Sequence, residues 1–152
     1  MELFRIARKR YIRDLSGEGA RRYGGRWNHK GVAVLYTSPT ASLAALEMLV
    51  NTSVASLPND LQLMVLSVPD SIPAGRIDMN RLPGNWSGWP SPEPLMNIGS
   101  DWIAAQSSLL LFVPSAVIPT EWNVLINPGH PDIENVKQMA VHDFRFDKRF
   151  RE

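Results

Sequence analysis

The chain has 152 residues, of which 44% are apolar and none is cysteine, and its formal net charge is +1 at pH 7. This composition fits one domain with its own core and argues against a disordered chain, a general polyanion binder, a disulfide scaffold and a thiolate metal site. No window approaches the ~18 apolar residues of a membrane span, and no apolar segment follows the basic N-terminal residues. We therefore expect a single cytoplasmic domain over residues 1–152.

In chain order, the pattern first predicts a strand at 3–6, a charged segment at 9–14 outside the core, and a glycine-rich loop at 15–25. A strand at 32–36 then leads into a helix at 39–50, with Ser38 as the cap and Pro39 in the first helical position. Leu43, Leu46 and Val50 form an apolar stripe on that helix, and Glu47 projects from the edge of the stripe.

The second half of the chain begins with a strand at 61–68. A proline-rich stretch at 69–94 follows, and its tryptophans indicate an ordered excursion over the fold rather than a linker. A helix at 101–108, capped by Ser100 or Asn97, precedes strands at 109–113 and 123–126. A turn at 127–131, a short helix at 132–138 and an edge strand at 139–146 complete the chain. The predicted fold class is α+β, with short helices and long connecting loops.

The charge is unevenly distributed along the chain. The balance is +6 over residues 1–30, −7 over 31–136 and +2 over 137–152. Because chain ends often lie close together in a compact domain, the basic residues can gather on one face. That face is either an ordinary solvated surface or a site for an anion such as a phosphate group, a nucleic acid or an acidic partner.

Few residues are placed for chemistry. The three histidines are scattered without metal-ligand spacing, so no metal site is expected. Arg26 follows two glycines and could hold a phosphate, although it could equally cover an aromatic ring at the surface. Tyr36 ends an apolar strand and is either a crevice residue or a core residue, whereas Glu47 needs a partner if it is partly buried. Ser115 follows a strand and a proline, where a serine can also serve a turn.

These segments together resemble the RES domain, the toxin component of RES–Xre type II toxin–antitoxin systems. The matching pieces are SGEGA at 16–20, GGRWN at 24–28, VLYTS at 34–38, LAALE at 43–47, Gly99 with Trp102, VPSA at 113–116, Asn123, Asn127-Pro128 and His130-Pro131. They occur in order over most of the chain, and the match is poorest between about residues 50 and 97.

The resemblance implies an ADP-ribosyltransferase-like split β-core around a cleft for NAD. It also implies an NAD glycohydrolase or NAD phosphorylase that breaks the nicotinamide–ribose bond, with NAD as substrate and no separate cofactor. The catalytic residues would be Arg26, Tyr36 and Glu47, and the NAD-binding residues would be Arg26, Asn28, Tyr36, Ser115 and Asn127. Arg26 would neutralise the pyrophosphate, Tyr36 would stack on the nicotinamide cation, and Glu47 would stabilise positive charge on the ribose.

The resemblance further implies a cognate Xre-type antitoxin as partner, and it leaves open a homodimer within that complex and inorganic phosphate as the acceptor. Contact with nucleic acid or membrane is not expected. Two other functions stay open: an ADP-ribosyltransferase that modifies a protein, and a non-enzymatic nucleic-acid-binding module that uses the basic ends. Against the last, the sequence has no helix-turn-helix spacing and no basic helix.

Overall fold

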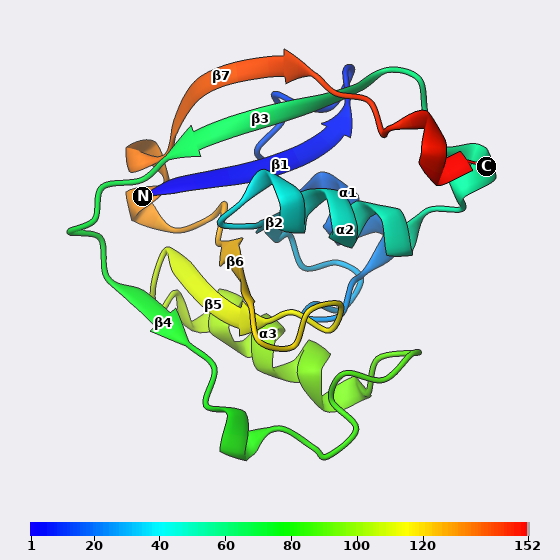
Figure 1. Cartoon of the computed structure of the whole chain (residues 1–152). Coiled ribbons are helices and arrows are strands. Elements are labelled where there is room, and N and C mark those ends of the chain that lie inside the picture. The colour runs from blue at the N-terminus through cyan, green and yellow to red at the C-terminus, as the bar shows by residue number, and fades with distance from the viewer. Residues whose placement is uncertain (152) are drawn as a thin grey trace.

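The computed structural model describes residues 1–151 and shows two β-sheets with three short α-helices (Figure 1). The strands are β1 (Glu2–Arg8), β2 (Leu35–Thr37), β3 (Leu61–Ser67), β4 (Ala74–Arg76), β5 (Leu110–Pro114), β6 (Trp122–Ile126) and β7 (Lys137–Asp143). The helices are α1 (Glu18–Tyr23), α2 (Ala41–Asn51) and α3 (Glu93–Ala105), with 3-10 turns η1 (Val54–Ser56), η2 (Met79–Arg81), η3 (Pro131–Asn135) and η4 (Lys148–Arg151). The predicted α+β class with a split β-core is confirmed.

The smaller sheet has the order β1-β3-β7, and both of its strand pairs are antiparallel. β7 forms one of its two edges, as the alternating sequence predicts, although it spans Lys137–Asp143 rather than 139–146. The larger sheet has the order β2-β6-β5-β4, in which only the β4–β5 pair is parallel. Two backbone hydrogen bonds between Phe4 and Ser38, at 2.8 and 3.0 Å, connect β1 with the chain just after β2 and so join the two sheets.

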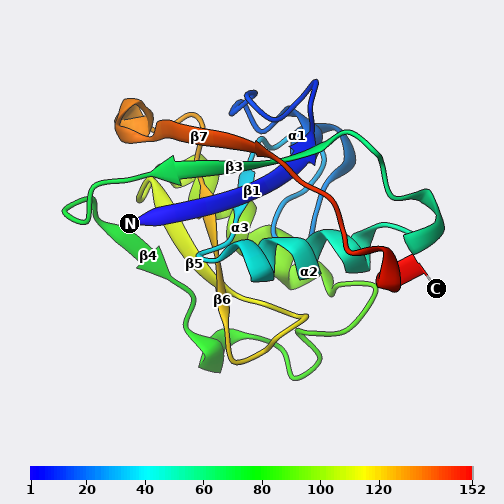
Figure 2. The same cartoon turned by 45° about the horizontal axis from the view of Figure 1, so that its top comes forward.

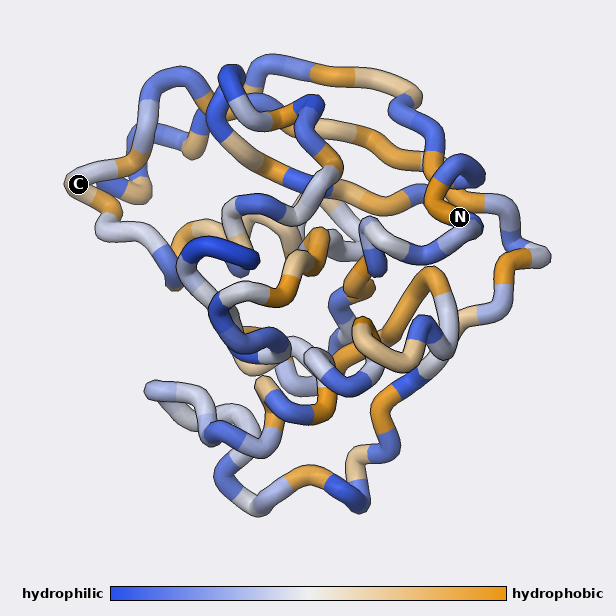
Figure 3. The backbone as a smooth tube through the Cα atoms, turned by 180° about the vertical axis from the view of Figure 1, so that it is seen from behind, coloured by the Kyte–Doolittle hydropathy of each residue, from blue (hydrophilic) through white to orange (hydrophobic). Residues whose placement is uncertain are grey.

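The larger sheet is buried on both faces, which explains its nearly continuous apolar strands. Leu110, Val124 and Ile126 belong to the core cluster that also contains residues of the smaller sheet. Their strand neighbours Leu111 and Leu125 belong to a second cluster, which includes Leu95 and Trp102 of α3. Figure 2 shows the layers from a second direction, and Figure 3 shows apolar stretches along the strands with hydrophilic stretches in peripheral loops.

Two helices begin elsewhere than the sequence predicts. α2 is capped by Thr40, whose Oγ1 accepts a hydrogen bond from the Leu43 amide at 3.1 Å, so Ser38 and Pro39 precede the helix. Its predicted apolar stripe is wrong at one end, because Val50 is 60% exposed. α3 begins at Glu93 rather than near residue 101, and its first turn accommodates a proline because helical amides there have no internal acceptor.

Three further predictions about the N-terminal third are corrected. The segment 15–25 contains α1 rather than being a loop throughout. Ile12 is only 1% exposed, so the charged segment 9–14 does contribute to the core. β2 is shorter than the predicted strand at 32–36 and ends one residue later.

The remaining segments largely follow expectation. The stretch 69–94 is an ordered excursion that contains β4 and η2, and the helix predicted at 132–138 is the 3-10 turn η3. Among the described residues, no helix is both long and apolar enough to cross a membrane.

Candidate active site

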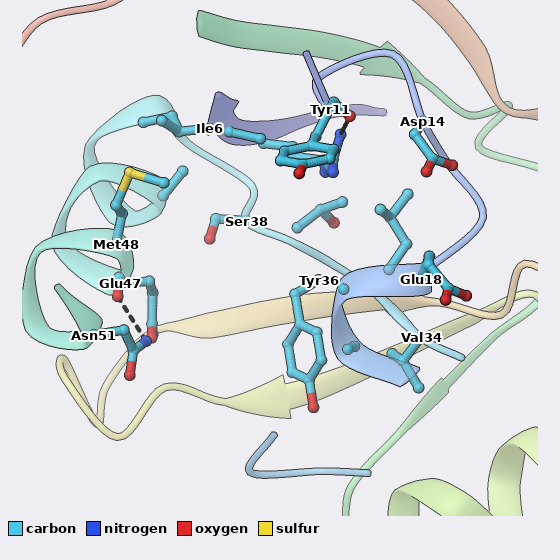
Figure 4. A pocket seen from close by; sticks show the side chains of 18 of the residues that line it. Ile6, Tyr11, Asp14, Glu18, Val34, Tyr36, Ser38, Glu47, Met48 and Asn51 are labelled. Atoms are coloured by element: carbon cyan, nitrogen blue, oxygen red, sulfur yellow. Dashed lines mark hydrogen bonds between the residues drawn. The ribbon is translucent and has the colours of Figure 1, made fainter. Parts of the chain in front are cut away.

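A cleft of two lobes runs beside α2 at the level of β2. The first lobe, of about 810 Å³, lies between β1, α1 and α2. The second lobe, of about 1320 Å³, is lined by residues 24–27, 29 and 30, by the segment before α3 and by the end of β5. Tyr36, Glu47, Asn51 and Asn123 line both lobes, so they mark the place where the lobes meet. Figure 4 shows the first lobe, with the labelled side chains of Glu47 from α2 and Tyr36 from β2.

The carboxylate of Glu47 is held through one of its two oxygens. Its Oε1 accepts hydrogen bonds from the Ser115 hydroxyl at 2.7 Å and from Asn123 Nδ2 at 2.6 Å. Asn123 is itself oriented, because the Ser38 hydroxyl donates to its Oδ1 at 2.7 Å. Within residues 1–151 no donor bonds Glu47 Oε2. The arrangement fixes the carboxylate and leaves one oxygen available at the junction.

Ser115 acts on this site through Glu47. Its side chain is buried, with 1% exposure, and its oxygen accepts the amides of Val117 and Ile118 at 3.1 and 3.0 Å. The single hydroxyl proton therefore goes to Glu47. Ser115 lines neither lobe, so its predicted direct contact with NAD stays a prediction.

The hydroxyl of Tyr36 is fully engaged inside the protein. It donates to Asn28 Oδ1 at 2.6 Å and accepts the Trp27 amide at 3.1 Å. Burial raises the pKa of this phenol, and the Trp27 amide and nearby Arg26 only partly oppose that rise. Tyr36 is thus neutral at physiological pH and offers the cleft its ring rather than a base. The space around the hydroxyl also explains Gly25, where a Cβ would lie 2.7 Å from the phenolic oxygen.

Asn28 and Asn127 lie outside the cleft lining. Asn28 is fully buried and its Nδ2 donates to the carbonyls of Ala20 and Val32 at 2.9 and 3.0 Å, which aims its Oδ1 at Tyr36. Asn127 is 2% exposed, and its Oδ1 accepts the Gly129 amide at 3.0 Å. Neither residue lines a lobe, and the predicted contact of each with NAD stays a prediction.

Arg26 carries a charge that no neighbouring carboxylate neutralises directly. Its Nη1 donates to the carbonyls of Trp86 and Gly88 at 2.9 and 3.0 Å, and in the described part of the chain no carboxylate lies within 4.0 Å. Partial burial lowers its pKa, whereas the charge of Glu47 raises it. A guanidinium remains charged in proteins, so Arg26 presents its other donors as a fixed cation beside the second lobe.

The sequence assigns no role to Asn123, although this residue bonds the candidate catalytic carboxylate. The available signal is an amide side chain inside an otherwise apolar strand, because a polar group in such a strand needs a partner. The predicted Arg26, Tyr36 and Glu47 do meet at one cleft.

The side chains that line this cleft can stabilise a positively charged sugar carbon and bind a phosphate group close to it. A carboxylate with a free oxygen can stabilise positive charge on a sugar carbon, as in glycoside hydrolysis. The ring of Tyr36 can pack on a cationic aromatic group, and Arg26 can bind a phosphate. Within residues 1–151 no three His, Cys, Asp or Glu side chains are grouped so as to hold a metal ion.

Known proteins resemble the chain over nearly its whole length. It matches the RES domain family over residues 2–148. It is 39% identical over 153 residues to "Toxin Res" of Yersinia enterocolitica, covering 99% of this chain and 100% of the relative. It is 39% identical over 138 residues to the "Prs ADP-ribosylating toxin" of Sphingobium sp., covering 90% of this chain and 86% of the relative. A chain of the M. tuberculosis MbcT–MbcA toxin–antitoxin complex shares the fold, with a TM-score of 0.75 at 18% identity over 94% of this chain and 83% of the other.

Proposed function

The chain belongs to the RES domain family, and on this premise we propose that it is the toxin of a toxin–antitoxin system and cleaves the nicotinamide–ribose bond of NAD. The observation that carries the proposal is the carboxylate of Glu47, held through Oε1 by Ser115 and Asn123 with Oε2 free. It lines the second lobe together with Tyr36 and Arg26, and Glu47 and Tyr36 also line the first lobe.

The reaction that this site supports begins with loss of the nicotinamide. The electron pair of the nicotinamide–ribose bond moves to the pyridinium nitrogen, so nicotinamide leaves as a neutral molecule and needs no proton. The ribose C1″ becomes positively charged, and Glu47 stabilises that charge. Water then adds to C1″ and loses a proton, which gives ADP-ribose; phosphate addition gives ADP-ribose 1″-phosphate.

The other two groups bind rather than transfer protons. Arg26 neutralises the pyrophosphate with the donors that Trp86 and Gly88 do not use. Tyr36 places its ring against the nicotinamide cation, since its hydroxyl is engaged elsewhere. In this proposal NAD is a substrate and no separate cofactor takes part.

The experiment measures NAD consumption by purified protein and its Glu47→Gln variant. Glutamine keeps the size of the side chain but removes the charge, so we expect the rate to fall about 100- to 1000-fold. Glu134→Gln, which changes an exposed glutamate of η3, is the matched control and should keep full activity. We also expect Arg26→Ala to lose activity. If Glu47→Gln is folded and consumes NAD at the wild-type rate, the proposal is wrong.

Transfer of ADP-ribose to a protein is the second candidate, favoured by the name of the Sphingobium relative, an ADP-ribosylating toxin. NAD labelled in its adenylate half separates the outcomes. Free ADP-ribose indicates water as acceptor, ADP-ribose 1″-phosphate indicates phosphate, and label on a protein indicates transfer.

We further propose an antitoxin protein as partner, acting with the chain in the cytoplasm. The similar fold in the MbcT–MbcA toxin–antitoxin complex supports such a partner. Its Xre type and a homodimer within the complex follow from the family resemblance alone. Co-expression with the product of the adjacent gene should restore growth and co-purify with the chain.

A further inference from the structure

We propose that Trp89 is the platform on which the adenine ring of NAD stacks, so that the adenosine half occupies the second lobe. The inference rests on the proposed function and adds the direction in which the substrate lies. Its starting point is an indole that the protein itself leaves uncovered.

Trp89 is 81% exposed, yet it lines the second lobe. The other tryptophans near the site are largely covered by the protein. Trp27 and Trp102 are 2% and 7% exposed, and Trp86 packs against the core cluster that contains them. An indole has a large apolar surface that proteins normally cover. On the wall of a cavity, such a surface is suited to a planar aromatic ligand.

The backbone immediately before Trp89 is already fixed. Arg26 binds the carbonyls of Trp86 and Gly88, the latter immediately before Trp89. The loop also has its own turns, since the Trp86 amide donates to Pro83 and the Gly88 amide donates to Asn85, at 3.0 and 2.9 Å. The cation that would bind the pyrophosphate thus also anchors the residue that would bind the base.

The charges of the two lobes favour this direction. The bond that breaks must lie at the junction beside Glu47, so the rest of the dinucleotide extends into one lobe. The first lobe is lined by three arginines, Arg5, Arg10 and Arg22, and by the three carboxylates of Asp14, Glu18 and Glu47, so its formal charges cancel and it offers a pyrophosphate no excess of positive charge. The second lobe contains Arg26 and Lys30, and Glu47 at the junction is the single carboxylate among its lining residues in the described chain. The pyrophosphate and the adenosine therefore fit the second lobe.

The test compares Trp89→Ala and Trp89→Phe with the wild type. We expect Trp89→Ala to raise the KM for NAD about tenfold, from the loss of one stacked base, without changing kcat or the melting temperature. Trp89→Phe keeps an aromatic face and should recover most of the affinity. ADP and nicotinamide mononucleotide are then compared as inhibitors of NAD consumption. In Trp89→Ala the Ki of ADP should rise about tenfold, whereas the Ki of nicotinamide mononucleotide should not change.

Two results would overturn the inference while leaving the proposed function intact. One is an unchanged KM for NAD in Trp89→Ala. The other is an equal loss for ADP and nicotinamide mononucleotide, which would mean that Trp89 does not distinguish the adenine half. Should the wild type consume no NAD, the proposed function fails by itself. In that case ADP is titrated into the protein while tryptophan fluorescence is monitored. Quenching in the wild type that Trp89→Phe abolishes supports the stacking platform, and a lack of quenching in the wild type refutes it.

Discussion

Replacing Tyr36 with phenylalanine removes one oxygen and leaves two buried polar groups without partners. Asn28 Oδ1 loses its donor, and the Trp27 amide loses its acceptor. Asn28 cannot turn toward another donor, because its Nδ2 is bound to the carbonyls of Ala20 and Val32. Each such group costs about 1–3 kcal/mol, so the free energy of unfolding should fall by roughly 2–6 kcal/mol. For a domain of this size that corresponds to a melting temperature lower by about 4–24 °C.

The pH dependence provides a second sign of the same contact. Burial raises the pKa of Tyr36 in the folded state, so the folded protein keeps a proton that the unfolded chain releases above pH about 10. The contribution of the hydroxyl is therefore complete below that pH and decreases as the pH rises further. The stability difference between wild type and Tyr36→Phe should shrink in that range.

Urea denaturation and NAD consumption together test this reasoning. Tyr23→Phe is the matched control, because Tyr23 also lines the cleft but is 77% exposed, and its stability should stay within about 0.5 kcal/mol of wild type. Below its melting temperature, Tyr36→Phe should retain kcat within about tenfold, since the ring remains. A variant that melts like the wild type but consumes no NAD would refute a structural hydroxyl and place it on the substrate.

Two further substitutions test the neighbouring backbone. In Gly99→Ala, the new Cβ would overlap the carbonyl oxygen of Trp27, and we expect a loss of about 3 kcal/mol or more in urea denaturation; Gly19→Ala, which meets nothing within 4 Å, should not lose stability. In Arg26→Ala, the segment 82–92 loses its anchor, so its amides should exchange with deuterium faster while those of β3 are unchanged. Unaltered exchange in that segment would contradict the anchoring.

Most strands were predictable because burial on one or both faces leaves a direct pattern in the sequence, whereas the three-residue β4 within the proline-rich stretch was not predicted. β3 and β5 lie within one residue of their predicted bounds at both ends. The helices were harder, because their ends depend on local chemistry. α1 has six residues between Gly17 and Gly24, too few for helical periodicity to appear, and the prolines before α3 suggest a loop although they are compatible with a first turn.

The sequence pointed to the charged and aromatic residues that line the cleft, but it did not anticipate the contact of the Asn123 amide with Glu47. Arg26, Tyr36 and Glu47 occupy one cleft as expected. An amide, however, serves either a ligand or nearby backbone, and sequence does not show which carbonyls fold back onto it. Asn28 is committed to such carbonyls, whereas Asn123 reaches the candidate carboxylate. The difference comes from long-range contacts between β6 and α2.

The anchoring of Arg26 has a consequence for how this protein can vary. Its two partners at positions 86 and 88 are backbone carbonyls, and every amino acid supplies a carbonyl. Side chains of this loop can therefore be exchanged without removing the acceptors that hold the guanidinium. Arg26 therefore holds the loop in place whatever side chains the loop carries. Substitutions in this segment can alter ligand preference while Arg26 and Glu47 stay unchanged.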